Sequence, residues 1–105
     1  MFSKNIFDLA VNCVESAIGI PYEAFMSARK SRYVDARSIL VRLLKDYGMS
    51  EQELSTYMGI SQQGINKLFN NHNLRMRFSP MVRRCYESAY NDFTTTLQRI
   101  HNSYN

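Results

Sequence analysis

Glycine and proline are scarce in this chain of 105 residues, which contains four glycines and two prolines. An all-β protein turns about every eight to twelve residues, and its turns are rich in both residue types. Long helices joined by short loops need far fewer of them. The chain is also long enough to enclose one core but too short for two domains of ordinary size. We therefore expect residues 1–105 to form one all-α domain.

Long apolar runs are also missing. No stretch reaches the roughly eighteen consecutive apolar residues of a membrane-spanning helix, and residues 1–5 lack the basic-then-apolar layout of a signal peptide. We therefore expect a cytoplasmic protein with no membrane partner. Without an export signal, Cys13 and Cys85 are expected to be buried thiols that act as small hydrophobic residues and form no disulfide.

Patterns typical of catalysis or metal binding are absent as well. His72 and His101 are far apart in the sequence and have no cysteine or carboxylate at ligand spacing. No Ser-His-Asp or Cys-His arrangement is present. Glu51 and Glu53 are accounted for by the favourable electrostatics of acidic residues at a helix start. We expect neither an enzyme nor a metal site, and no cofactor.

Acidic residues are absent from residues 54–86, a stretch that contains five basic residues: Lys67, Arg75, Arg77, Arg83 and Arg84. A second basic stretch, residues 27–45, has Asp35 as its one acid against Arg29, Lys30, Arg32, Arg37, Arg42 and Lys45. Residues 1–26 are acidic overall, so the modest net charge of +4 conceals two basic stretches. Such stretches are typical of proteins that bind a polyanion, although solvated helix faces also produce them.

Apolar residues recur at three- and four-residue intervals, which is the period of an amphipathic helix. The pattern predicts a bundle of about six helices, over residues 4–18, 22–26, 33–47, 51–58, 61–70 and 80–101. Pro21 and Pro80 suit the first turn of a helix. Ser50 and Glu53 have the spacing of a capping box, and Ser61 is a second N-cap candidate. The predicted fold is an all-α bundle that ends in a long helix.

Residues 51–70 have the pattern of a helix-turn-helix. Gly59 falls in the turn, where a positive φ is needed, and Ser55 is small enough for the two helices to cross closely. The positions that face the core of such a unit are all apolar: Leu54, Met58, Ile60, Ile65 and Leu68. An ordinary pair of antiparallel helices is the alternative, but the register of these residues favours the helix-turn-helix.

Residues 61–70 are then the recognition helix, which enters the major groove of DNA. With Ile65, Leu68 and Phe69 toward the core, the residues left for base contacts are Ser61, Gln62, Gln63, Asn66, Lys67 and Asn70. Amide side chains can bond bidentately to adenine, and lysine favours guanine or phosphate. Gly64 costs about 1 kcal/mol relative to alanine inside a helix, and the sequence leaves open whether DNA approach or packing requires it.

Four features between Ala17 and Asn70 point to a known family: a short helix ending at Phe25-Met26, a basic loop at residues 29–32, Ala36-Arg37 before the apolar run 39–41, and Ser50 ahead of the helix pair. With these features the stretch resembles the C-terminal DNA-binding domain of the bacterial replication initiator DnaA, which has a Trp-repressor-like helix-turn-helix fold. The resemblance implies that Arg29, Lys30 and Arg32 reach the minor groove or phosphates. It also places Arg37 near the DNA backbone.

The chain departs from this family at the start of the recognition helix. The segment Ser61-Gln62-Gln63-Gly64 stands where the family has Asp-His-Thr-Thr, so the family's sequence preference is not carried over. The turn around Gly59 is one residue shorter. The glycine-rich phosphate loop of an ATPase portion is absent, and the helix after Pro80 lies outside the family's domain. The chain is therefore similar to the DNA-binding module rather than to a whole initiator.

Two other segments bear on partners. Arg75, Arg77, Arg83 and Arg84 flank Phe78, and they form either a phosphate clamp or a solvated loop, so Arg75 and Arg77 are further candidates for DNA-backbone contact. The last helix carries an apolar series that either closes the core against residues 4–18 or forms a homodimer seam: Tyr86, Tyr90, Phe93, Leu97, Ile100 and Tyr104.

The leading interpretation is a protein that binds double-stranded DNA with sequence preference, in transcription regulation or replication. The alternative is a helical protein-interaction module that uses the aromatic C-terminal helix.

Overall fold

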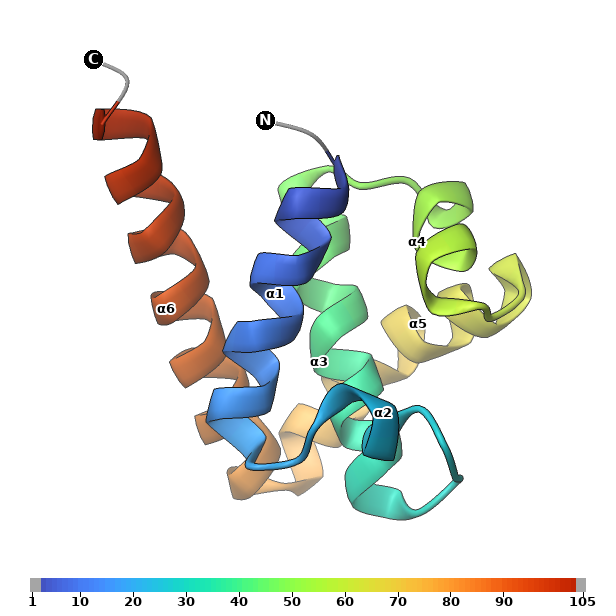
Figure 1. Ribbon diagram of the computed structural model, residues 1–105. Helices are drawn as coiled ribbons and strands as arrows, with labels where there is room; N and C mark the ends of the chain where they lie inside the picture. Colours follow the sequence, from blue (N-terminus) through green and yellow to red (C-terminus); the bar gives the residue numbers. More distant parts are fainter. Residues whose placement is uncertain (1–2, 104–105) are drawn as a thin grey trace.

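Six α-helices joined by short turns make up residues 3–103, the part of the chain that the computed structural model describes (Figure 1). They are α1 (Ser3–Ile18), α2 (Tyr22–Phe25), α3 (Ser31–Tyr47), α4 (Glu51–Met58), α5 (Gln62–Phe78) and α6 (Pro80–Ser103). No strand occurs within these residues. The predicted all-α single-domain bundle is confirmed. None of the described helices combines the length and the apolar character that crossing a membrane requires.

The central helix is α3, which packs against each of the other five helices. Its apolar residues Ile39, Leu40 and Leu44 are fully buried, because they lie on the faces covered by α1, α5 and α6. Arg42 and Lys45 occupy the flank that remains partly open. Burying side chains of this size contributes about 1.5–3 kcal/mol each, so α3 is the main source of hydrophobic stabilisation.

The last helix, α6, lies alongside α1 and closes the core (Figure 1). Phe93 is buried and Leu97 packs against the core, as the core-closing alternative predicted. Tyr90 does not follow the predicted apolar series, because about half of its side chain is exposed. The small residue Ala89 is buried instead, where α6 approaches its neighbours. Tyr104, the last member of the predicted apolar series, lies outside the described residues.

The prediction that the fifth helix ends at Asn70 is wrong, because α5 continues to Phe78. The cluster of asparagines at residues 70–73 predicts a helix end, because asparagine has low helix propensity. His72, in the middle of that cluster, is completely buried, and this tertiary packing outweighs the local preference. Arg75 and Arg77 therefore lie in the last turn of α5 and not in a connecting loop. The third helix also begins two residues earlier than predicted, at Ser31.

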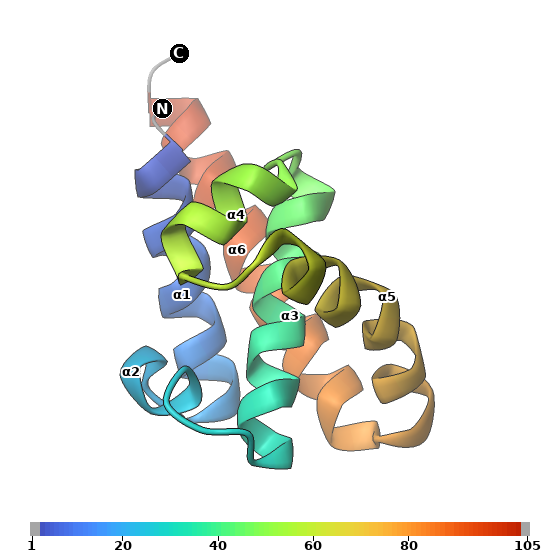
Figure 2. The ribbon, with the colours of Figure 1, turned by 90° about the vertical axis from the view of Figure 1, so that its right-hand side faces the viewer.

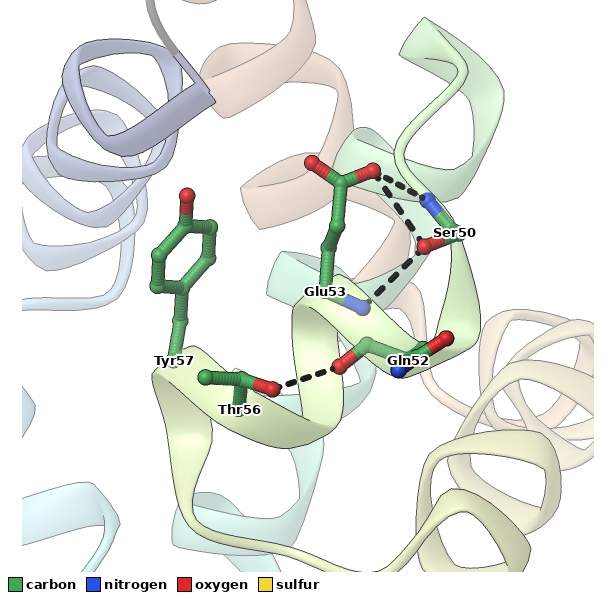
Figure 3. Close-up of a pocket in the computed structure, with 5 residues that line it drawn as sticks. All are labelled: Ser50, Gln52, Glu53, Thr56 and Tyr57. Atoms are coloured by element: carbon green, nitrogen blue, oxygen red, sulfur yellow. Dashed lines mark hydrogen bonds between the residues drawn. The ribbon is translucent and has the colours of Figure 1, made fainter.

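Local capping residues define the start and end of α4 and the start of α5. The predicted capping box is present: the Glu53 N–H donates to Ser50 Oγ at 3.1 Å, and the Ser50 N–H donates to the Glu53 carboxylate at 3.2 Å (Figure 3). Gly59 ends α4 with the positive φ expected for it, 68°. Ser61 caps α5 by accepting a bond from the Gly64 N–H at 3.0 Å. These bonds satisfy backbone donors at the start of each helix and fix the turn.

Candidate nucleic-acid interface

The helices α4 and α5 form a tight pair around the turn Gly59-Ile60-Ser61. Inside the turn, Ser55 Oγ donates a hydrogen bond to the Ile60 carbonyl, which a larger side chain at residue 55 would prevent. The five apolar positions predicted to face the core do so: Leu54, Met58 and Ile65 are buried, while Ile60 and Leu68 are partly buried against the core. The apolar sides of both helices are thus fixed, and the polar side of α5 faces outward.

Most of the predicted base-contact residues lie on the outward face of α5. Gln62, Gln63, Lys67 and Asn70 are exposed there, and Ser61 is exposed at the N-cap. Asn66 differs, because it is partly buried on the side toward α4. The hydrogen bond from Lys45 lowers the pKa of the Glu51 carboxyl group, and the nearby Asn66 amide adds to this effect. The exposed amides of this face are therefore those of Gln62, Gln63 and Asn70.

The structure explains why residue 64 is a glycine. A Cβ atom at this position would lie 2.5 Å from Ile60 Cγ2 and 3.3 Å from Ser61 Oγ. The Ile60 methyl group has little freedom to move, because it is attached to a branched Cβ that packs against the core. Internal packing between the turn and the first turn of α5 therefore requires glycine, whatever lies outside the helix.

The basic loop between α2 and α3 contains two exposed cations, Arg29 and Lys30. Two further arginines hold this loop in place. Arg37, which is partly buried on α3, donates a hydrogen bond to the Ala28 carbonyl, and Arg32 Nη2 donates to the Ile18 carbonyl at 3.1 Å. Of the predicted backbone-contact residues in this region, Arg29, Lys30 and Arg32 are thus exposed, although Arg32 also bonds to the Ile18 carbonyl, while the partly buried Arg37 positions the loop.

A groove separates this loop from the start of α5. Figure 2 shows the arrangement of the backbone there, with α3 between the loop and α5. The groove has a volume of about 420 Å³, and its basic lining residues are Arg29, Arg37 and Lys67. A smaller hollow of about 100 Å³ continues it along α5 toward Asn71 and Arg75. The two basic stretches of the sequence therefore meet at one concave surface.

Positive charge is concentrated around this groove. Burial lowers the pKa of Arg37, and the neighbouring charges of Arg29 and Arg75 lower it further. Arg75 is compensated, since its Nη1 atom lies 2.8 Å from a carboxylate oxygen of Asp35, which is itself buried. An anion in the groove would reduce the repulsion between Arg29 and Arg37, because opposite charge favours the charged form of both groups.

The other arginines near Phe78 lie at the corner between α5 and α6. Arg77, Arg83 and Arg84 are exposed, and Arg83 Nη1 donates a hydrogen bond to the Met76 carbonyl at 3.3 Å. Arg77 follows Lys67 by ten residues of helix, which corresponds to about 15 Å along the axis of α5. These residues therefore form a basic surface that is separate from the groove.

His72 is a structural residue that the sequence reasoning missed. It is completely buried, its Nδ1 atom is 3.4 Å from Ser38 Oγ, and its ring meets that of Tyr86 edge to face at 5.1 Å. Burial lowers its pKa to about 4, so the ring is neutral near pH 7. The sequence does contain a pattern that indicates this burial, since residue 72 continues the core-facing series Ile65, Leu68 and Phe69 at helical spacing.

The two cysteines are unpaired, as expected. Cys13 is buried, and burial together with nearby Asp92 raises the pKa of its thiol to about 12. Cys85 is only partly buried, and its thiol donates to the Ala17 carbonyl at a sulfur to oxygen distance of 3.4 Å. Within residues 3–103, no group of three or more histidine, cysteine or acidic side chains is arranged to hold a metal ion.

No family model, curated protein or solved structure matches the chain. The assignment of a function therefore depends on the residues and the geometry described above.

Proposed function

We propose that the protein binds double-stranded DNA with sequence preference, and that α4 and α5 act as a helix-turn-helix. The observation that carries this proposal is the groove between Arg29, Arg37 and Lys67, which lies beside the exposed amides of α5. A polyanion with readable base edges fits both features, because cations bind its phosphates while amides bond to its bases.

In this arrangement the first turns of α5 enter the major groove. Gln62, Gln63 and Asn70 bond to base edges, and Lys67 bonds to guanine or to a phosphate at the rim. Arg29 and Lys30 contact the adjacent backbone or the minor groove. Arg37 acts mainly by holding the loop, through its bond to the Ala28 carbonyl.

The resemblance of residues 17–70 to the DNA-binding domain of DnaA supports the same arrangement, since that family uses a basic loop together with a helix-turn-helix. The process served would be transcription regulation or replication, and the location would be the cytoplasm, where bacterial DNA lies. No catalytic step and no cofactor belong to this proposal.

A selection of genomic fragments by the purified protein, followed by fluorescence anisotropy on the enriched duplex, tests the proposal. We expect the logarithm of the affinity to fall with the logarithm of salt concentration at about 0.9 per phosphate contacted, so about five contacts give a slope near −4.5. A flat salt response, or no enrichment of any sequence, would contradict DNA binding.

Variants separate base contacts from backbone contacts. Gln63→Ala should reduce discrimination between the selected duplex and an unrelated one, whereas Arg29→Ala should weaken binding to both alike and reduce the salt slope by about one. Arg99→Ala is the matched control, because it removes one exposed positive charge from α6 at the other side of the molecule. If Gln63→Ala and Arg29→Ala behaved identically, the assignment of α5 to the major groove would be wrong.

A second candidate function is a protein-interaction module that uses α6. A hollow of about 210 Å³ between α3 and α6 is lined by Tyr47, Tyr90, Phe93 and Leu97, and both tyrosines are about half exposed. A homodimer through this surface is its simplest form. Sedimentation velocity at increasing concentration tests it, and a dimer that Tyr90→Ser dissociates would favour this candidate.

A further inference from the structure

The corner between α5 and α6 presents the two most exposed large apolar side chains of residues 3–103. Phe78 is 77% exposed and Leu74 is 52% exposed. They lie one turn apart on α5, and they continue the outward face of Gln63, Lys67 and Asn70 at helical spacing. Two such side chains side by side form a patch, unlike apolar residues scattered singly over a surface.

The surroundings of this pair are basic. Arg77 lies between the two on the same helix, and Arg83 is held against the end of α5 by its bond to the Met76 carbonyl. Arg84 is exposed beside Arg83. Leu74, Phe78, Arg77, Arg83 and Arg84 are called the corner patch below.

Among residues 3–103, no carboxylate forms an ion pair with these three arginines in the way that Asp35 does with Arg75. The described chain has no acid from residue 54 to residue 86, and Glu87 is the first one beyond the patch. The other two exposed large hydrophobic residues of residues 3–103, Tyr47 and Tyr90, instead lie beside an acid, Asp46, in the hollow between α3 and α6. The combination of exposed apolar and uncompensated basic side chains is therefore particular to the corner.

DNA does not account for this combination. A recognition helix contacts base edges through its N-terminal residues, whereas Leu74 lies about 10 Å further along the axis than Lys67. The surface of DNA beyond its grooves is a row of charged phosphates, against which leucine and phenylalanine would stay in contact with water. Arginine and aromatic residues together are instead enriched at protein interfaces.

We propose that the corner patch binds an acidic amphipathic helix of a partner protein. Apolar side chains of that helix cover Leu74 and Phe78, and its carboxylates pair with Arg77, Arg83 and Arg84. Arginine favours this chemistry because its planar guanidinium can bond to both oxygens of a carboxylate. The patch does not include the residues of the groove, so this inference stands or falls independently of DNA binding.

Fluorescence anisotropy with the full chain and two designed helical peptides tests the proposal. Each labelled peptide has about sixteen residues, with leucine at helical spacing, and differs from the other only in having glutamate or lysine at the remaining positions. We expect the glutamate peptide to bind with an affinity that falls as salt is raised. The lysine peptide should not bind.

Substitutions locate the binding surface. Phe78→Ser should weaken binding of the glutamate peptide about tenfold or more, because it removes the apolar anchor, and Arg77→Ala should weaken it severalfold. Arg99→Ala is the matched control for Arg77→Ala, since it removes an exposed positive charge outside the patch and should leave binding unchanged. Circular dichroism checks that each variant is folded, which is expected because Phe78 and Arg77 are both exposed.

Several results would overturn the proposal. They are a failure of the glutamate peptide to bind, equal binding of the two peptides, or binding that Phe78→Ser does not weaken. Duplex DNA and vesicles of anionic phospholipid are measured in parallel. If Phe78→Ser weakened binding to either of these and not to the glutamate peptide, the patch would be a nucleic-acid or a lipid surface.

Discussion

The buried imidazole of His72 should make the stability of the fold depend on pH in a defined range. Its pKa is lowered to about 4, first by burial and then by the charge of Arg42, with Asp46 opposing and Arg75 adding to the effect. In the unfolded chain the ring titrates near 6.5. Above pH 6.5 both states are neutral at this residue, so it adds no pH dependence there. Between pH 6.5 and 4 the unfolded state binds a proton that the folded state does not, so the free energy of unfolding falls as pH falls.

The magnitude follows from the two pKa values. The gap of about 2.5 pH units corresponds to about 3 kcal/mol at 1.36 kcal/mol per unit, and this loss is complete near pH 4. A small domain has a total stability of about 5–15 kcal/mol, so the loss is a substantial part of it. His72→Leu removes the titrating group and also the Nε2 atom, which is buried without a hydrogen-bond partner among the described residues.

Urea unfolding followed by circular dichroism at intervals from pH 7.5 to pH 4.5 measures this effect. We expect the native chain to lose about 2 kcal/mol more than His72→Leu over that range, while acidic residues that titrate in both chains cancel in the comparison. Parallel pH profiles for the native chain and His72→Leu would refute the reasoning.

Three further predictions concern packing and capping, and all are measured as free energies of unfolding in urea. Gly64→Ala should lower the free energy of unfolding by about 1 kcal/mol, because the clash with Ile60 Cγ2 costs about 1–3 kcal/mol and outweighs the better helix propensity of alanine. In an Ile60→Ala background Gly64→Ala should instead stabilise the fold. A stabilising Gly64→Ala in the native chain would contradict this. Ser50→Ala should cost about 1 kcal/mol by removing the side-chain acceptor of the residue 53 N–H, and most of this cost should remain when Glu53 is already alanine, because that donor belongs to the backbone. Leu40→Ala on α3 should cost about 2–5 kcal/mol, and a smaller loss would mean that the centre of the bundle is loosely packed.

Much of the fold could be predicted because helical periodicity and end signals are local. The apolar spacing indicated all six helices, and Ser50, Gly59 and Ser61 were predicted at the ends of α4 and α5 where the structure has them. The end of α5 could not be read locally. Asparagine-rich residues 70–73 continue the helix because His72 enters a site between α3, α5 and α6, and this site exists only in the assembled bundle.

The residue types of the candidate site could be predicted from the sequence, but the role of each residue could not. Arg29 and Arg37 look equivalent in the sequence, yet one is exposed and the other is turned back onto the Ala28 carbonyl. Asn66 belongs by spacing to the outward face, but it is partly buried, and its amide contributes to lowering the pKa of Glu51 on the neighbouring helix. Both differences depend on which backbone or carboxylate oxygen lies within reach, and this is set by how α3, α4 and α5 pack together.

The central helix α3 packs against every other helix, whereas the exposed amides that are proposed to contact bases lie on α5. Stability and the predicted base contacts therefore reside in different residues, so one can diverge during evolution without the other. Gln62, Gln63 and Asn70 are exposed, so under the proposed function a lineage could change the preferred DNA sequence there in single steps while every intermediate stays folded. The same independence makes these three positions the natural ones to randomise in a laboratory library.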